Sequence, residues 1–292
     1  MKFRGHETFA IRKNWISKGL KKSVEIPTLF FGKDRNPMDD LGIGSNMVKS
    51  LRYWMTSVGL LREAQQGRKR IHELTELGQL VWKYDKYTEE WGTLWLMHYS
   101  LVKNQDEATA WYYFFNEFNL SEFSKEDFVY HINNYIALNK GDVAVKSLDD
   151  DFRCIVNSYM PRYKTNPGKD SPEDNMECPL SELGLIDYQS SVAKTYKKVN
   201  AVKDNIPALI LLAVIIEQAA GKQEISLTEL LNAKCNIGKV FNLDVITMLS
   251  ILTQLSNDGL VKVVRTAGLD MVRITTPLTF LECVERYYSE LA

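Results

Sequence analysis

Apolar side chains recur at the spacing of an α-helix over much of the chain, and residues 37–58 show this pattern clearly. Pro37 and the acidic residues that follow it mark a helix start, and a glycine-containing turn comes next. Ser45 or Asn46 can then cap a second helix. The apolar positions of this second helix are Met47, Val48, Leu51, Tyr53, Trp54, Met55 and Val58. The pattern predicts a helix, a turn and a helix.

A hairpin is predicted directly after this second helix. Gly59 ends the helix, and residues 60–62 and 71–74 have the composition of short strands. The tip between them contains Gly67 followed by a basic run, Arg68, Lys69 and Arg70. Two helices followed by a hairpin with a basic tip is the order of a winged helix-turn-helix.

An amphipathic segment at residues 11–20 predicts a further helix at the start of this domain. Ile11, Trp15 and Ile16 lie on one face of that helix, and basic residues lie on the other. We therefore expect a winged-helix domain over residues 1–83.

Residues 84–204 are predicted to form a helical middle with a long loop. Aromatic and aliphatic residues repeat at helical spacing in residues 91–102, 108–118 and 124–138. Their density in an acidic segment favours core packing over a role in base stacking, and we expect His98 and His131 in the core or at its rim. Several prolines make residues 160–188 a long loop, with short strands or a hairpin towards residue 199.

Residues 205–292 repeat the pattern of the N-terminal segment. Helices are predicted at 207–220, 226–231 and 244–255, before a hairpin around Gly268, and residues 259–262 match residues 59–62. The chain is thus expected to be mainly α, with winged helix-turn-helix domains at both ends of a helical, loop-containing middle. No apolar run reaches membrane-spanning length, and the N-terminus lacks a signal-peptide core, so we expect a cytoplasmic protein without a membrane partner.

Charge changes this picture because it is unevenly distributed. The 292-residue chain has a formal net charge of −1, yet residues 1–83 hold 16 Lys and Arg against 8 Asp and Glu, which leaves 20 against 29 elsewhere. A local basic excess is typical of a surface that binds duplex DNA, although a basic hairpin tip can also serve only solubility. Residues 221–292 hold 7 basic against 8 acidic residues, so we assign that domain to assembly, for example as a homodimer.

The predicted contacts with double-stranded DNA follow from this assignment. Polar residues of the second helix, Ser45, Asn46, Lys49 and Arg52, would reach base edges, and the hairpin tip would meet phosphate or a minor groove. Arg12 and Lys13 of the first helix would lie along the backbone.

Metal and acid-base chemistry has weaker candidates. Asp149, Asp150 and Asp151 are adjacent near a predicted helix start, where carboxylates ordinarily interact with the helix dipole. They could alternatively hold Mg²⁺ or Mn²⁺, with Asp150, Asp151 and a distant Glu7 as ligands. His6 and Glu7 could form a metal or acid-base pair, but His6 packed on Phe9 or Trp15 is the favoured interpretation. The four cysteines show no paired spacing, which disfavours zinc and indicates reduced thiols.

The opening motif resembles a known family. Residues 3–9 read Phe-Arg-Gly-His-Glu-Thr-Phe and are followed by Arg12 and by Trp15-x-x-Lys18-Gly19, while residues 73–78 read Glu-Leu-Thr-Glu-Leu-Gly. These features resemble the SspB-like nicking proteins of bacterial single-strand DNA phosphorothioation systems, which take part in antiphage defence.

The resemblance implies a protein that binds DNA and nicks one strand so that sulfur can enter the backbone. It also implies a divalent metal and phosphorothioation partner proteins, but it transfers no catalytic motif to this sequence. A non-catalytic winged-helix adaptor or transcription regulator is the alternative, and a third interpretation is a docking module for an acidic protein partner.

Overall fold

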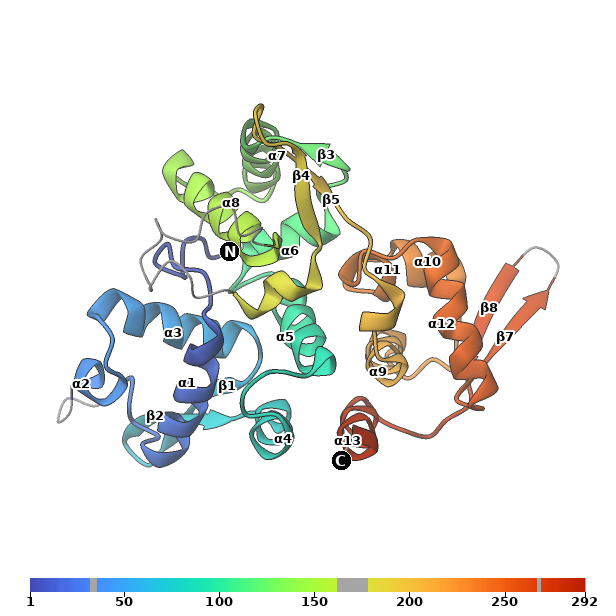
Figure 1. The fold of residues 1–292 in the computed structure, drawn as a ribbon, viewed down its shortest axis with the longest axis horizontal. Coiled ribbons are helices and arrows are strands. Elements are labelled where there is room, and N and C mark those ends of the chain that lie inside the picture. Colours follow the sequence, from blue (N-terminus) through green and yellow to red (C-terminus); the bar gives the residue numbers. More distant parts are fainter. Residues whose placement is uncertain (32–35, 162–177, 267–268, 292) are drawn as a thin grey trace.

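The fold is mainly helical and contains small sheets. The computed structural model describes residues 1–31, 36–161, 178–266 and 269–291. The N-terminal elements, the central helices and the C-terminal elements follow one another across the molecule (Figure 1). One continuous hydrophobic core runs through all three parts. The proposed division at residues 83 and 204 remains a prediction.

The N-terminal part is built from short helices and one hairpin. Asn36 caps the second of these helices by accepting a hydrogen bond from the Met38 backbone N–H. Gly44 precedes the third helix without a side-chain cap, so the expected cap by Ser45 or Asn46 is wrong, and both residues lie in the first turn. The elements are α1 (Lys13–Glu25), α2 (Pro37–Leu41), α3 (Ser45–Ser57), β1 (Leu61–Gln66), β2 (Lys69–Leu74) and α4 (Glu76–Tyr84).

The hairpin of β1 and β2 is longer than the sequence suggested. Its antiparallel register runs from Leu61 opposite Leu74 to Gln66 opposite Lys69. Gly67 has a φ of 60°, which a two-residue turn of this kind requires. Consequently Lys69 and Arg70 belong to β2, and Arg68 alone of the basic run lies in the turn.

The central part consists of packed helices and a small antiparallel sheet in the order β3-β5-β4. Ser124 forms the capping box that its sequence predicts, with Asp127 as its partner. The aromatic residues of α6 are buried, which confirms their place in the core. The elements are α5 (Trp91–Lys103), α6 (Thr109–Asn116), β3 (Glu122–Phe123), α7 (Lys125–Leu138), α8 (Val145–Tyr159), η1 (Pro179–Leu183), β4 (Ile186–Ser190) and β5 (Thr195–Lys198).

One prediction for this part is wrong, and two others concern residues outside the described ranges. Helix α8 begins at Val145, so Asp149, Asp150 and Asp151 lie inside the helix rather than at its start. They therefore cannot act as an N-terminal cap. Most of the predicted long loop falls on residues 162–177, and the predicted turn at Gly268 also lies outside the described residues.

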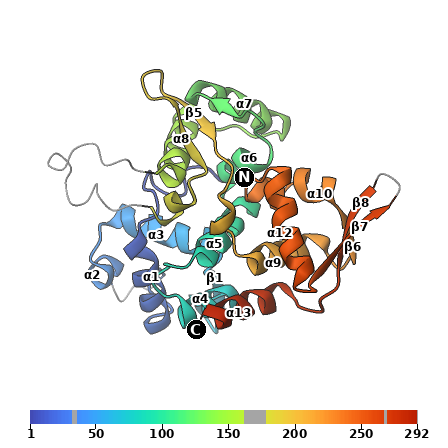
Figure 2. The ribbon, with the colours of Figure 1, turned by 45° about the vertical axis from the view of Figure 1, so that its right-hand side comes forward.

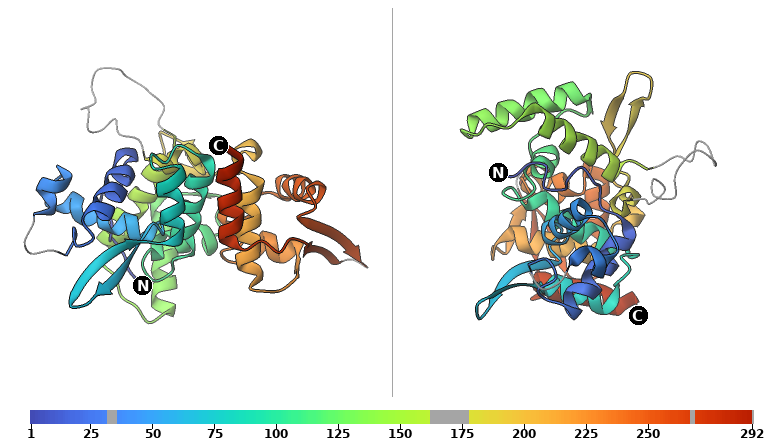
Figure 3. Two further views of the ribbon diagram at one scale, coloured as in Figure 1. Left: turned by 90° about the horizontal axis from the view of Figure 1, so that it is seen from below. Right: turned by 90° about the vertical axis from the view of Figure 1, so that its left-hand side faces the viewer.

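The C-terminal part ends in a helix that the sequence analysis did not anticipate. Helix α13 packs against α9 and α4, beside the start of α5 (Figures 1 and 3). The Gly92 N–H donates to the Tyr287 hydroxyl at 3.0 Å, and Tyr288 stacks on Tyr84. The elements are η2 (Lys203–Asn205), α9 (Ala208–Ala219), β6 (Glu224–Ser226), α10 (Leu227–Asn232), α11 (Ile237–Val240), α12 (Val245–Asn257), β7 (Val261–Thr266), β8 (Leu269–Ile274) and α13 (Phe280–Leu291).

The internal similarity between the two ends extends to individual hydrogen bonds. Helices α3 and α12 begin 200 positions apart, as do the two hairpins β1–β2 and β7–β8. Thr75 donates its hydroxyl to the Gly59 carbonyl, and Thr275 does the same to Gly259. The two hairpins project from opposite ends of the molecule (Figure 3).

Within the described residues, no single helix is both long enough and apolar enough to span a membrane. The helix pair Leu227–Val240 and Val245–Asn257, which is bent at the break between its two parts, has the necessary length and apolar composition only when both parts are taken together.

The sheet of β4 and β5 stands beside α8 (Figure 2).

Candidate nucleic-acid interface

The first residues of the chain are anchored on helix α8. His6 Nε2 lies 2.7 Å from Asp151 Oδ1, and both side chains are fully buried. The Arg4 backbone N–H donates to the same oxygen at 2.9 Å, while the Arg4 Nε pairs with Asp150 Oδ2 at 2.9 Å. These contacts fix the N-terminal segment against a helix that lies about 145 residues later in the sequence.

The expected packing of His6 on Phe9 or Trp15 is wrong. Its ring lies among Tyr53, Trp54 and Trp111, and the Trp111 ring is 5.5 Å away in an edge-on arrangement. Gly5 permits this approach, because an added Cβ would lie 2.5 Å from the Tyr53 ring. The segment thus packs on α3 and α6 as well as on α8.

Asp150 and Asp151 already have partners in the N-terminal segment. Burial raises the pKa of Asp151, although His6 and the Arg4 backbone N–H oppose that rise. A divalent ion would have to displace the Arg4 guanidinium from Asp150 or the imidazole from Asp151, whereas Asp151 Oδ2 is buried without a hydrogen-bond partner, so metal binding by these residues stays a prediction. Glu7 is half-buried with a φ of 49°, and no contact joins it to either aspartate among the described interactions. Across the described ranges, no group of three or more His, Cys, Asp or Glu is arranged to hold a metal.

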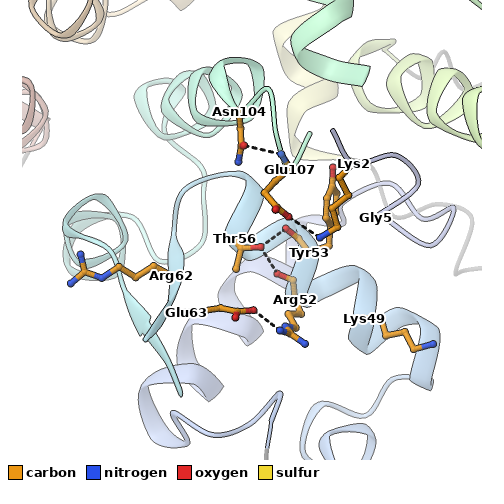
Figure 4. Close-up of a pocket in the computed structure, with 10 residues that line it drawn as sticks. All are labelled: Lys2, Gly5, Lys49, Arg52, Tyr53, Thr56, Arg62, Glu63, Asn104 and Glu107. Carbon is orange, nitrogen blue, oxygen red and sulfur yellow. Dashed lines mark hydrogen bonds and ion pairs between the residues drawn. The ribbon is translucent and has the colours of Figure 1, made fainter. Parts of the chain in front are cut away.

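A groove of about 550 Å³ opens beside this segment, between α3, β1 and the turn after α5. Figure 4 shows Arg52 and Glu63 pointing toward each other, with Lys49 and Arg62 on opposite sides of them. The groove is lined by Lys2, Gly5, Lys49, Arg52, Tyr53, Thr56, Arg62, Glu63, Asn104 and Glu107. We call this the basic groove, since four of its charged residues are cationic and two are acidic.

The basic groove continues into a second and wider one of about 890 Å³. Thr56, Arg62 and Asn104 line both. The second groove reaches Lys103 and Lys234 and so connects the N-terminal elements with the C-terminal part. Together the two grooves offer an extended path rather than an enclosed pocket.

A cluster of aromatic and charged side chains adjoins the basic groove, and two of its members, Arg52 and Glu63, line it. The Arg52 and Arg70 guanidinium groups lie 4.3 and 4.5 Å from the Phe31 ring centre. Both also bind Glu63, with the Arg70 Nη2 at 2.5 Å from Oε2. His72 stacks on Phe31 at 4.4 Å. We call Phe31, Arg52, Glu63, Arg70 and His72 the Phe31 cluster.

The ionisation of the Phe31 cluster follows from these contacts. Partial burial raises the pKa of Glu63, but hydrogen bonds from Arg52 and Arg70 outweigh that effect and leave the pKa below its ordinary value. Burial, with the nearby Arg52, lowers the pKa of His72 to about 4. At neutral pH the cluster therefore contains two cations, one carboxylate and a neutral imidazole.

The structure brings some predicted DNA contacts together and separates others. Lys49 and Arg52 line the basic groove, whereas Ser45, Asn46, Arg68 and Lys69 are exposed beside it on α3 and the hairpin. Arg12 and Lys13 lie outside the basic groove, where Arg12 lies over Trp15 at 5.1 Å and Lys13 pairs with Glu182 at 3.3 Å, and their contact with DNA stays a prediction.

Sequence reasoning missed Lys2, Arg62 and Glu63 as groove residues. Arg70 lies opposite Gln65 and Glu63 lies two positions before Gln65, so Glu63 and Arg70 are diagonal neighbours on one face of the hairpin. The alternation of side chains between the two faces of β1 was the signal that could have indicated this pair. Lys2 reaches the groove through a 2.8 Å ion pair with Glu107, which no local pattern indicates. Cys154, Cys178, Cys235 and Cys283 are free thiols.

Comparison with known proteins places this chain in a family. Two solved structures, described as "Magnesium ion-bound SspB crystal structure" and "SspB crystal structure", each match with a TM-score of 0.86, at 25% and 26% identity. Each match covers 99% of this chain and 88% of the other chain. No curated protein sequence matches.

The resemblance to SspB-like proteins that the N-terminal motif indicated is thereby confirmed. The family model described as "Protein of unknown function (DUF4007)" matches residues 3–288. This SspB-like chain therefore belongs to the DUF4007 family.

Proposed function

We propose that this protein binds duplex DNA within a phosphorothioation-linked bacterial defence system. The observation that carries the proposal is the basic groove, which Lys49 and Arg52 of α3 and Arg62 of the hairpin line together. Arg62 also pairs with Glu73 at 2.7 Å, and this pair is exposed. Phosphate contacts dominate the affinity of DNA-binding proteins, and clustered Lys and Arg side chains supply them. The SspB likeness supports the link to phosphorothioation.

The N-terminal part acts in this proposal as a winged helix-turn-helix. Helix α3 would be the recognition helix, with Ser45, Asn46 and Lys49 exposed near its first turn. The β1–β2 hairpin would be the wing. The similar C-terminal elements, which lack the basic excess, would mediate assembly with a second copy or with phosphorothioation partner proteins.

Nicking of one strand is the catalytic part of the proposal. The SspB resemblance supports it, and the magnesium-bound state of one relative supports a divalent cofactor. Asp150 and Asp151 hold Arg4 and His6 in this structure, and we propose that these contacts serve stability. The contacts favour a second candidate function, a non-catalytic DNA-binding adaptor or regulator.

One experiment separates these functions. Purified protein is incubated with supercoiled plasmid, with and without Mg²⁺ or Mn²⁺, and the products are resolved beside a mobility-shift lane. Metal-dependent open circles without linear product would support nicking, and a shift without open circles would support the adaptor. Absence of a shift at low salt would contradict DNA binding.

A further inference from the structure

The Phe31 cluster has the geometry of an anion-binding site that is occupied by a side chain of the protein itself. Two guanidinium groups converge on a single carboxylate, and each oxygen of Glu63 accepts from a different arginine. Guanidinium groups bind phosphate and carboxylate oxygens through the same planar donors. The two arginines thus present a site that a phosphate group can also fill.

The aromatic and hairpin contacts hold these arginines in place. Both stack on Phe31, and His72 closes the cluster by stacking on the same ring. The His72 backbone N–H donates to the Pro27 carbonyl at 2.8 Å, so the segment carrying Phe31 is tied to β2. A guanidinium that is already positioned loses less freedom when it binds a ligand.

Glu63 is held in the cluster by its two arginine partners within the described residues. Its side chain is 42% exposed, compared with 34% for Arg52, 63% for Arg70 and 1% for His72, so solvent and a ligand can reach the carboxylate. An ion pair of this exposure contributes little, so an incoming phosphate competes with a weak partner. Arg52 and Glu63 both face the basic groove, where the backbone of a bound duplex would pass.

We propose that Arg52 and Arg70 form a phosphate subsite for the DNA backbone and that Glu63 fills this subsite in the free protein, so that DNA must displace it. This inference rests on the proposed DNA binding and adds its regulation. Glu63 thereby lowers the affinity for every duplex by the cost of its displacement.

The test measures duplex affinity by fluorescence anisotropy for full-length wild type and Glu63→Gln. The expected result is a gain of about threefold to tenfold for Glu63→Gln, because a weak competing ion pair is lost. Glu25→Gln is the matched control. Glu25 is also 42% exposed and ion-paired, to Lys22 of α1, so the control makes the same change in net charge outside the groove.

A double-mutant comparison tests the mechanism. Glu63→Gln is repeated in an Arg52→Gln, Arg70→Gln background, where the proposed subsite is absent, and thermal melting checks that each variant folds. There the gain should shrink to that of the Glu25→Gln control. An equal gain in both backgrounds, or equal affinities for Glu63→Gln and Glu25→Gln, would overturn the proposal. If wild type and Glu63→Gln both fail to bind duplex at low salt, the proposed function itself fails.

Discussion

Replacing His6 by Ala should destabilise the whole protein, although His6 lies near the chain terminus. The substitution leaves Asp151 fully buried without the imidazole that sits 2.7 Å from its Oδ1. Removing one partner of a buried pair costs about 3–5 kcal/mol, which corresponds to a loss of about 10 °C in Tm for a chain of this size. Melting followed by circular dichroism measures this loss.

The pH dependence of that loss identifies its cause. Burial already raises the pKa of Asp151, and His6 opposes the rise, so His6→Ala moves the folded-state pKa further above that of the unfolded chain. The carboxyl is protonated in both states below about pH 4. Stability is lost as pH rises from there towards the folded-state pKa. His6→Ala should therefore fall further behind wild type at pH 8 than at pH 5.

Two further variants serve as controls. His6→Gln keeps an N–H that can donate to Asp151 and should recover part of the loss. His131 is exposed on α7, so His131→Ala should change stability by less than about 0.5 kcal/mol. A His6→Ala protein that melts with wild type, or a loss that does not depend on pH, would refute the assignment of His6 and Asp151 as an anchor.

Three other substitutions have defined outcomes. Reversing the charge of Arg68, Lys69 and Arg70 should weaken binding to all duplexes and flatten the salt slope by about 2–3 units, and an unchanged affinity would remove the hairpin from the interface. Gly78→Ala should cost about 1–3 kcal/mol in chemical denaturation, because its Cβ would lie 2.1 Å from the Leu60 carbonyl oxygen, whereas Gly44→Ala meets nothing within 4 Å and should cost less. The pKa of His72 drops to about 4 on folding, so this side chain removes stability as pH falls from 6.5 towards 4, and wild type should lose about 2 kcal/mol more than His72→Phe over that range. Identical acid melting curves for wild type and His72→Phe would contradict that titration.

Local patterns predicted the helices and hairpins well, because their signals lie within a few residues. Local sequence predicted three features that the structure has: the capping box of Ser124, the turn at Gly67 and the buried aromatic residues of α6. The match between residues 59–62 and 259–262 also corresponds to equivalent hydrogen bonds in the structure.

The same local patterns did not predict contacts between side chains that lie far apart in the sequence. The row of three aspartates suggested a cap or a metal site; the cap is wrong because α8 begins at Val145, and the contacts of Asp150 and Asp151 with Arg4 and His6 had no signal in the local sequence. The contact depends on packing between residues far apart in sequence, which spacing does not encode. The contact of Lys13 with Glu182 likewise joins residues far apart in sequence and had no local signal.

The central claim is that the basic groove meets the phosphates of duplex DNA. Its most direct test is a salt titration of duplex affinity for wild type and for a Lys49→Gln, Arg62→Gln variant, which loses two groove cations. The control is a Lys83→Gln, Lys222→Gln variant with the same charge change at side chains that are 60% and 66% exposed. The account predicts that the groove variant lowers the slope of log affinity against log salt by about 2, while the control variant does not. Equal slopes for wild type and the groove variant would contradict it.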